Sequence, residues 1–294
     1  MAATSLQPGL LRVVAPNPSA MTADGTATYV LGAGRNRAVI DPGPRDGGHR
    51  DAVRAAIGSA HVTAILVTHP HLDHSAGAPA LAAATGAPVL AYGRAGDGRS
   101  ERMAGLDRLG GGEGADLSFR PDRSLSDGAI VAGDGWTLRA VWTPGHMGAH
   151  HAFHWLEGRA AFTGDVVMGW ASTMISPPDG DVDRFLASID RIADLELDRL
   201  YPGHGEPVLD PKTRCAELRA HRMDRERAIF DYLNHLDRPA TIPEIVDVIY
   251  VGTPPSLRAA AARNVLAHLI RLTSLGRVAA DKMTPDGTFV AVGR

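Results

Sequence analysis

The stretch "THPHLDH" (residues 68–74) places four metal-ligating side chains within six positions, directly after the apolar run "AILV". The apolar run predicts a buried strand. Because residues i and i+2 share one face of a strand, His69 and His71 can approach the same metal ion. Asp73 and His74 come after the strand end, where a turn can direct them to a second ion. Imidazole and carboxylate ligands are typical of zinc.

Three later stretches repeat this pattern of a β-type run that ends in a ligand. "VWTPGH" ends at His146, "AAFTGD" at Asp165 and "RLYPGH" at His204. The Gly and Pro residues in these stretches permit tight backbone turns that can direct the three side chains toward a common point. Together with the first stretch, seven ligands at four strand ends are what two metal ions would need.

In this order, "THPHLDH", "TPGH", "TGD" and "YPGHG" resemble the motifs of the metallo-β-lactamase fold superfamily. The resemblance covers about residues 10–235. It implies an αββα sandwich with a dinuclear site, holding two zinc ions per chain, along one edge of the two sheets. It also implies the ligand sets, which are His69, His71 and His146 for the first metal, Asp73, His74 and His204 for the second, and Asp165 between both.

The composition is that of a globular protein with a core. The chain has 294 residues, of which 44% are hydrophobic and 21% charged. Its formal net charge of -3 gives no general attraction to nucleic acid or to an acidic membrane. Cys215 is the only cysteine, which favours a reducing compartment. Because the chain also has no leader-type start and no apolar stretch of membrane-spanning length, we expect a cytoplasmic protein.

The region around the motifs alternates short strands with helices. "DVDRFLASIDRIADL" carries its apolar residues on one helical stripe, with Asp181 as N-cap. A second helix is predicted from Pro211, capped by Asp210, to about Leu236. Residues 93–128 are rich in glycine and charge, which indicates a long loop with one short helix.

The last part of the chain predicts a small second domain. "TIPE" is a capping box for a helix that ends near Tyr250, and a longer helix ends at Gly276. A β-hairpin that turns at Asp286-Gly287 follows. Helix, helix and hairpin outline a winged helix. We therefore expect a catalytic domain at 1–237 and a winged-helix domain at 238–294.

"YPGHGEPVLDP" and "HRMDRERAI", followed by a winged helix, resemble the β-lactamase-like protein 2 branch of the superfamily. That branch includes a mitochondrial endoribonuclease acting on single-stranded RNA and many bacterial hydrolases. The resemblance implies a hydrolase in which a metal-bridging hydroxide cleaves an ester, thioester or phosphodiester bond. The alternatives are an endoribonuclease on single-stranded RNA, a glyoxalase II-like thioesterase and a mononuclear iron dioxygenase.

Other residues are candidates for supporting roles near the metals. Besides ligating a metal, Asp73 can orient the hydroxide and shuttle a proton, which makes it the catalytic candidate. Asp41 in "VIDPG" is expected to form hydrogen bonds near the ligands. His150 is a candidate to contact substrate or a metal ligand, or it merely begins a strand.

The helix that contains "HRMDRERAI" has two interpretations. In the functional one, His221 and Arg222 contact substrate near the metal groove. In the structural one, which we favour, i,i+4 pairs such as Arg222 with Glu226 stabilise a helix that docks two domains.

The winged helix also has two interpretations. Arg258, Arg263 and Arg271 on its second helix could bind DNA, or this helix packs against the catalytic domain and walls the substrate groove. We favour the second interpretation. The expected partner is thus a small molecule or single-stranded RNA, with no duplex DNA and no membrane, and a homodimer remains open.

Overall fold

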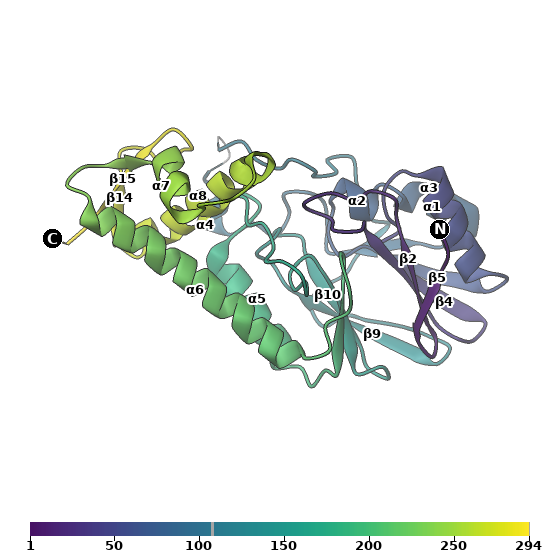
Figure 1. Ribbon diagram of the computed structural model, residues 1–294. Coiled ribbons are helices and arrows are strands. Elements are labelled where there is room, and N and C mark those ends of the chain that lie inside the picture. The colour runs from purple at the N-terminus through teal and green to yellow at the C-terminus, as the bar shows by residue number, and fades with distance from the viewer. Residues whose placement is uncertain (107–108, 294) are drawn as a thin grey trace.

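The structure is a computed structural model that describes residues 1–106 and 109–293 (Figure 1). Two β-sheets pack face to face, and a smaller domain lies at the C-terminal end of the molecule. Within the described residues, the first sheet has the strand order β1-β2-β3-β4-β5-β6-β7. Its strands are β1 (Thr4–Gln7), β2 (Leu10–Val14), β3 (Ala27–Leu31), β4 (Asn36–Ile40), β5 (His61–Leu66), β6 (Val89–Ala91) and β7 (Arg123–Ser124).

The second sheet has the order β12-β11-β10-β9-β8 in the part of the chain that is described. Its strands are β8 (Ile130–Gly133), β9 (Trp136–Trp142), β10 (His151–Trp155), β11 (Ala160–Gly164) and β12 (Arg199–Pro202). β11 and β12 are parallel, whereas β8, β9, β10 and β11 pair antiparallel.

The main core lies between the two sheets. It forms because alternate side chains along each strand point toward the other sheet. Tyr29 and Leu31 of β3 point into this core and meet Phe153 and Phe162 of the second sheet. Val30, between them in sequence, joins a separate core on the outer face of the first sheet. Because successive strand residues point to opposite faces, an apolar run with both faces covered is buried throughout, as β3 is.

Helices cover the outer faces of both sheets, so that the larger, N-terminal part is an αββα sandwich as predicted. On the first sheet lie α1 (Gly47–Ile57) and α3 (Ala78–Thr85), and α2 (Leu72–Ser75) follows the strand β5. The other helices of this part are α4 (Glu101–Ala104), α5 (Val182–Ala193) and α6 (Pro211–His235). Asp181 caps α5 and Asp210 caps α6, which confirms both predicted helix starts.

The C-terminal domain is a winged helix, as predicted. It contains β13 (Ala240–Thr241), α7 (Ile242–Ile249), η1 (Pro255–Leu257), α8 (Arg258–Ser274), β14 (Val278–Ala280) and β15 (Thr288–Ala291). The predicted capping box is present at the start of α7. The hairpin is present too, although Asp286 and Gly287 end a longer connection, in which Gly287 N donates to Thr284 O.

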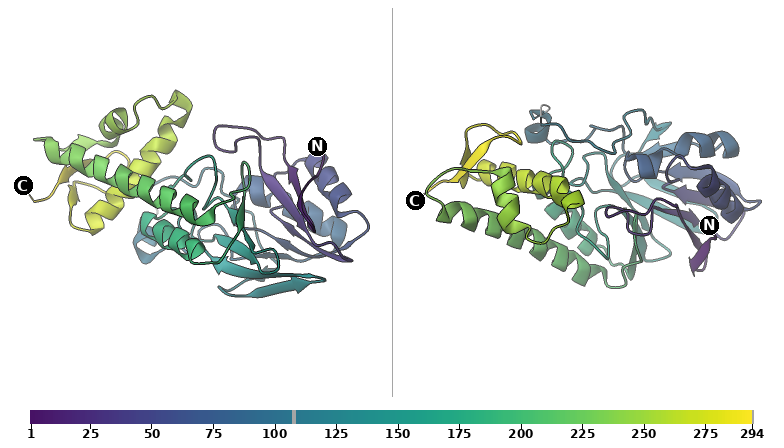
Figure 2. Two further views of the ribbon diagram at one scale, coloured as in Figure 1. Left: turned by 60° about the horizontal axis from the view of Figure 1, so that its bottom comes forward. Right: turned by 45° about the horizontal axis from the view of Figure 1, so that its top comes forward.

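Helix α6 runs from the sandwich to the winged helix and belongs to both parts (Figure 2). Cys215 and Leu218 in its first half pack into the core beneath α5. Ile229 and Leu233 in its second half belong to the winged-helix core. The second core therefore reaches across the boundary predicted at 237/238. No helix among the described residues is long and apolar enough to cross a membrane.

Candidate metal centre

Four strand ends deliver the predicted ligands to one edge of the sandwich. The "THPHLDH" segment follows β5, and the turns after β9, β11 and β12 carry His146, Asp165 and His204. The side chains form two groups. The first group is His69, His71, His146 and Asp165, and the second is Asp73, His74 and His204.

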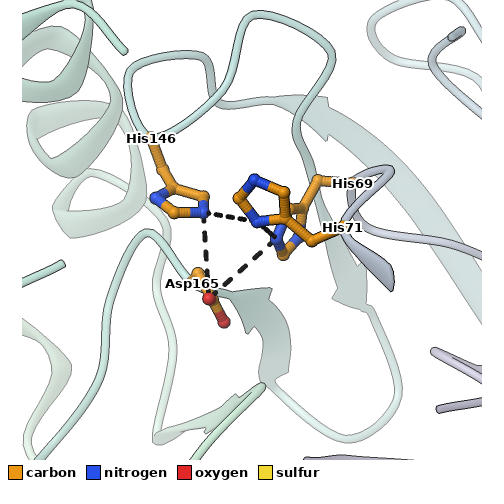
Figure 3. A group of neighbouring side chains, drawn as sticks. All are labelled: His69, His71, His146 and Asp165. Carbon is orange, nitrogen blue, oxygen red and sulfur yellow. Dashed lines mark hydrogen bonds and ion pairs between the residues drawn. The ribbon is translucent and has the colours of Figure 1, made fainter. Parts of the chain in front are cut away.

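In the first group three imidazole nitrogens converge (Figure 3). Nδ1 of His71 lies 2.9 Å from Nε2 of His69 and 3.1 Å from Nε2 of His146. Oδ2 of Asp165 lies 3.9 Å from Nε2 of His69 and 3.8 Å from Nε2 of His146. Four ligand atoms thus surround one point.

In the second group, Oδ2 of Asp73 lies 3.4 Å from Nε2 of His74 and 3.3 Å from Nε2 of His204. Oδ1 of Asp165 lies 3.4 Å from each of the same two nitrogens. Asp165 therefore directs one carboxylate oxygen to each group. This is the position that the resemblance implies for the ligand shared by two metals.

The residues present fit two metal ions. Nε2 of His74 and Oδ1 of Asp165 are buried and have no hydrogen-bond partner among the described residues. A Cβ on Gly203 would lie 2.5 Å from His74 Cε1 and 2.6 Å from Asp165 Oδ1, so only glycine leaves this space open. The donor set of imidazole nitrogens and carboxylate oxygens suits zinc. Both groups are consistent with a dinuclear site.

Burial keeps His69 and His71 of the first group in the neutral form that binds metals. Burial, together with the neighbouring His74 and His71, holds the pKa of His69 well below its ordinary value. Burial and His146 lower the pKa of His71 to about 3. Both imidazoles are therefore neutral at physiological pH, and a neutral imidazole offers the lone pair that a metal needs.

The two histidines of the second group lie among carboxylates that raise their pKa values. Although burial opposes it, the carboxylates of Asp73, Asp165 and Asp41 raise the pKa of His74 well above its ordinary value. The pKa of His204 is raised against burial as well, chiefly by Asp165. Protons thus bind where the carboxylates concentrate negative charge, and a metal cation would take their place.

Asp41 contacts the ligand His74 and accepts hydrogen bonds from Thr68, which confirms that it forms hydrogen bonds near the ligands as predicted. Its Oδ2 lies 2.9 Å from Nδ1 of His74 and accepts a hydrogen bond from Thr68 Oγ1 at 2.8 Å. Thr68 N donates to Oδ1 at 2.7 Å. Asp41 has a φ of 50°, in the left-handed region that Asp tolerates better than most residues. The carboxylate fixes the ring orientation of His74.

Further supports of the ligands were not predicted. Nδ1 of His146 lies 2.8 Å from Met174 O, and Nδ1 of His204 lies 3.2 Å from Gly25 O. Thr26 Oγ1 donates to Oδ2 of Asp73 at 2.9 Å. Backbone carbonyls carry no signal in a sequence, since every residue has one. Thr26 begins a β-type run and has no distinguishing neighbour there.

His150 lies behind the metal centre. It is fully buried, its ring stacks on His69 with 5.1 Å between centroids, and its Nε2 accepts from Asp165 N at 3.3 Å. Its Nδ1 lies 2.8 Å from Thr143 Oγ1. A Cβ on Gly164 would lie 2.6 Å from Nε2 of His150, so the glycine of "TGD" lets the histidine approach. His150 is thus placed to support ligands.

His221 and Arg222 line a cleft beside the metal centre. Arg222 is buried and donates to Thr173 O and, at 3.0 Å, to Asn264 Oδ1. The predicted Arg222–Glu226 pair is wrong. Glu226 instead bonds to residues of α8, because the second half of α6 packs against that helix.

A cavity of about 570 Å³ opens over the ligands. His71, Asp73 and Asp165 are part of its floor, and its walls are largely apolar. The apolar wall residues are Ala20, Met21, Met168, Trp170, Ala171, Met174, Leu257, Ala259 and Ala260. Arg263 is the only arginine or lysine among the described residues that line the cavity.

The winged helix forms one wall of this cavity, through η1 and the start of α8. The three arginines considered for DNA binding are engaged within the chain. Arg258 pairs with Asp247, and Arg263 donates to Ser176 Oγ and to Leu109 O. Arg271 binds acidic residues of α5 and α6.

Comparison with known proteins agrees with this architecture. Residues 21–204 match the profile of the metallo-beta-lactamase superfamily, and residues 241–285 match the beta-lactamase associated winged helix domain. The chain is 31% identical over 281 residues to the beta-lactamase-like protein 2 homolog of Caenorhabditis elegans, covering 93% of this chain and 87% of that protein.

Two other relatives bear on function and fold. The chain is 29% identical over 265 residues to the atrochrysone carboxyl ACP thioesterase of Aspergillus fumigatus, covering 85% of this chain and 76% of that protein. It superposes with a TM-score of 0.77 on the crystal structure of a metallo-beta-lactamase family protein from Thermus thermophilus. The two are 26% identical, and the match covers 98% of this chain and 100% of the other.

Proposed function

Because the chain belongs to the metallo-β-lactamase superfamily and is a metallohydrolase of that fold, we propose that it hydrolyses acyl thioesters with a pair of zinc ions. The cavity above the ligands carries this proposal, because its walls are mostly apolar and one arginine is its only strong cation among the described residues. An acyl chain buries favourably there, at roughly 0.8 kcal/mol per methylene group. The relative in Aspergillus fumigatus, named as a thioesterase, supports the same bond type.

The chain's own residues would divide the work as follows. His69, His71 and His146 would hold one zinc, Asp73, His74 and His204 the other, and Asp165 would contact both. When bound, two zinc ions supply Lewis acidity toward the thioester carbonyl and ionise water near neutral pH. Met21, Met168 and Trp170 would surround the acyl chain and exclude bulk water from the carbonyl.

Asp73 is the residue that we assign to proton transfer. Thr26 Oγ1 donates to its Oδ2, whereas its Oδ1 has no hydrogen-bond partner within the described chain. Its side chain lines the cavity and is 27% exposed. Oδ1 can therefore hold the proton of the attacking water and deliver it to the sulfur as the C–S bond breaks.

The test is an activity screen of the zinc-loaded protein. Hexanoyl-N-acetylcysteamine, a lactone, a cephalosporin and a single-stranded RNA are offered separately, and each assay is repeated with Asp165→Ala. We expect thioester hydrolysis to be the dominant activity and to be lost in the variant. Cleavage of RNA without thioester turnover would refute the thioesterase proposal.

Endoribonuclease activity on single-stranded RNA is the second candidate. Trp170, which is 44% exposed, lines both the cavity and the neighbouring cleft, and arginines line that cleft too. Single-stranded nucleic acids bind through such aromatic and cationic groups. The cavity over the metals favours the acyl substrate, however, because RNA phosphates beside the scissile bond would meet only Arg263 there.

We propose zinc over iron, and a small-molecule substrate over duplex DNA. The two ligand groups suit a pair of metal ions, whereas a mononuclear iron dioxygenase needs only one such ligand group. Arg258, Arg263 and Arg271 would have to leave partners within the chain to bind DNA. Metal analysis decides the first point, since two zinc ions per chain support hydrolysis and one iron supports oxidation.

A further inference from the structure

A second cleft lies beside the active-site cavity and shares a wall with it. The cleft has a volume of about 480 Å³. Residues 170–173 line both hollows, so a single segment of chain separates them. The opposite walls of the cleft are α6 and, from the winged helix, Tyr250 and Asn264. The metal centre and the cleft therefore lie on two sides of the same segment.

Helix α6 lines this cleft with positive charge. Arg214, His221, Arg222 and Arg225 all face it, and their spacing of seven, eight and eleven residues from Arg214 places them on one helix face. Glu217 is the only acidic residue among the described residues that line the cleft, and it pairs with Arg214 at 3.0 Å. The other two arginines, Arg222 and Arg225, have no acidic partner among the described residues that line the cleft.

Arg222 and Arg225 lack a carboxylate partner among the described residues. Arg222 is 2% exposed and bonds to Thr173 O and to the amide of Asn264. Arg225 donates from Nη1 to Ile249 O at 2.6 Å and lies over the ring of Tyr250 at 4.3 Å. The Nε atoms of both arginines are buried without a hydrogen-bond partner in the described chain.

This arrangement is electrostatically incomplete. Burial lowers the pKa of Arg222 to about 10, and burial together with Arg222 and Arg225 lowers the pKa of His221. Removing a guanidinium from water is costly unless a negative charge compensates for it. An anion in the cleft would supply that charge, and several arginine and histidine donors match the oxygens of a phosphate ester.

We propose that this cleft binds a phosphate on the thiol half of the substrate, so that the enzyme acts on acyl thioesters of phosphorylated thiols. The inference rests on the proposed thioesterase function and names its substrate class. The acyl chain lies in the apolar cavity, the thioester lies at the metal centre, and the thiol half passes Trp170 to reach Arg225 and His221. Hydrolysis adds water across the C–S bond and releases a carboxylic acid and a phosphorylated thiol.

The test compares two thioesters with the same acyl group in the zinc-loaded protein. Hexanoyl-coenzyme A carries phosphate, and hexanoyl-N-acetylcysteamine does not. We expect Arg225→Gln to raise KM for the coenzyme A thioester about tenfold. His221→Gln, a change at an exposed residue, should raise the same KM to a smaller extent. KM for the other thioester and kcat for both should stay unchanged.

Arg227→Gln is the matched control, because Arg227 lies on α6, is 68% exposed and pairs with Asp224 outside the cleft. It should change neither KM. Inorganic pyrophosphate distinguishes substrate phosphate from a separate phosphorylated effector. It should compete with the coenzyme A thioester and leave turnover of the other thioester unchanged, whereas an effect on both would overturn the proposal.

Direct binding separates this inference from the proposed function. Free coenzyme A should bind the wild-type protein about tenfold more tightly than Arg225→Gln in a calorimetric titration. If both thioesters are hydrolysed and neither Arg225→Gln nor His221→Gln changes KM or binding, the phosphate site is refuted and the thioesterase stands. If coenzyme A binding depends on Arg225 but no thioester is hydrolysed, the thioesterase is refuted, and with it the substrate assignment.

Discussion

Asp165 is the residue at which the two ligand groups meet. Each of its carboxylate oxygens faces histidines of a different group, at distances between 3.4 and 3.9 Å. The backbone N–H of Asp165 is itself fixed by His150, and glycines at 164 and 203 leave the space that this packing needs. The centre thus depends on small residues as much as on ligands.

Asp41→Asn tests how far the metals depend on residues behind the ligands. The amide keeps the shape of the carboxylate but loses the charge beside Nδ1 of His74. We expect zinc affinity at the second site to fall about 10- to 100-fold, as measured by competition with a chelator. Asp46→Asn is the control, since Asp46 caps α1 and Asn caps a helix equally well. Equal zinc affinity in both variants would contradict the role of Asp41.

The seven ligand candidates could be predicted from the sequence because short, dense motifs carry them. "THPHLDH" places four of them in seven residues, and the other three follow Gly-containing turns. The supports could not be predicted, since Met174 and Gly25 contribute only carbonyl oxygens. Helical spacing predicts Glu226 as the partner of Arg222, but the partners of Arg222 are Thr173 O and the side chain of Asn264 in α8.

Among the elements, α8 has a role that its sequence predicts only in outline. Its start, with Ala259 and Ala260, forms a wall of the active-site cavity. Small side chains there leave room for an acyl chain. The winged helix thereby forms part of the cavity that opens over the metal ligands.

Ala260→Leu should narrow the cavity without disturbing the core. We expect KM for a hexanoyl thioester to rise about tenfold, because a filled cavity no longer buries the chain. KM for an acetyl thioester should change little. The quantity to measure is therefore the ratio of KM for the hexanoyl thioester to KM for the acetyl thioester. Ala220→Leu, on an exposed face of α6, is the matched control. An unchanged ratio in Ala260→Leu would remove α8 from the substrate site.

Elements with clear caps were predicted well, and α1 shows why others were not. Asp181 and Asp210 precede strongly helical sequences, whereas α1 begins with Gly47 and Gly48, which are poor helix formers. Its N-cap at Asp46 accepts from His49 N at 2.6 Å, and packing on the first sheet stabilises the helix. A segment of low helix propensity forms a helix only when tertiary contacts of this kind stabilise it, and the local sequence does not reveal these contacts.

At the scale of the whole molecule, charged side chains fasten the winged helix to the sandwich. Arg271 of α8 binds Glu226 of α6 and, at 2.5 Å, Asp183 of α5. Arg102 in turn binds Asp183 at 2.9 Å. Asp183 and Arg271 are 88 residues apart in sequence, so no spacing rule predicts their contact. The network holds α8 where it lines the active-site cavity.

Glu226→Gln should weaken this attachment. Glu226 is buried beside His268 and Arg271, and removing its charge leaves Asp183 as the one remaining carboxylate partner of Arg271 among the described residues. We expect the free energy of unfolding at pH 7 to fall by about 2 kcal/mol, the loss of a charge-assisted hydrogen bond, measured by chemical denaturation. Asp224→Asn, which removes an exposed i,i+3 pair on the same helix, should cost less than about 0.5 kcal/mol.

The effect of Glu226 should also depend on pH in a defined direction. Although burial opposes it, hydrogen bonds from His268 and Arg271 lower the pKa of Glu226 below its ordinary value of 4.5. The ionised carboxylate therefore stabilises the fold above the unfolded pKa, and this stabilisation is lost as pH falls through the lower folded pKa. The stability difference between wild type and variant should be full at pH 7 and shrink below pH 4.5. A difference that grows in acid would contradict this assignment.

The most direct test of the central claim is a zinc titration of the metal-free protein, with hydrolysis of hexanoyl-N-acetylcysteamine followed at each step. We predict that the rate reaches its maximum at two zinc ions per chain. Asp165→Ala should bind fewer ions and lose at least about a hundredfold in rate, since losing a ligand shared by both sites costs more than losing an outer support. Full hydrolysis with one metal per chain, or an undiminished rate in Asp165→Ala, would contradict the dinuclear thioesterase.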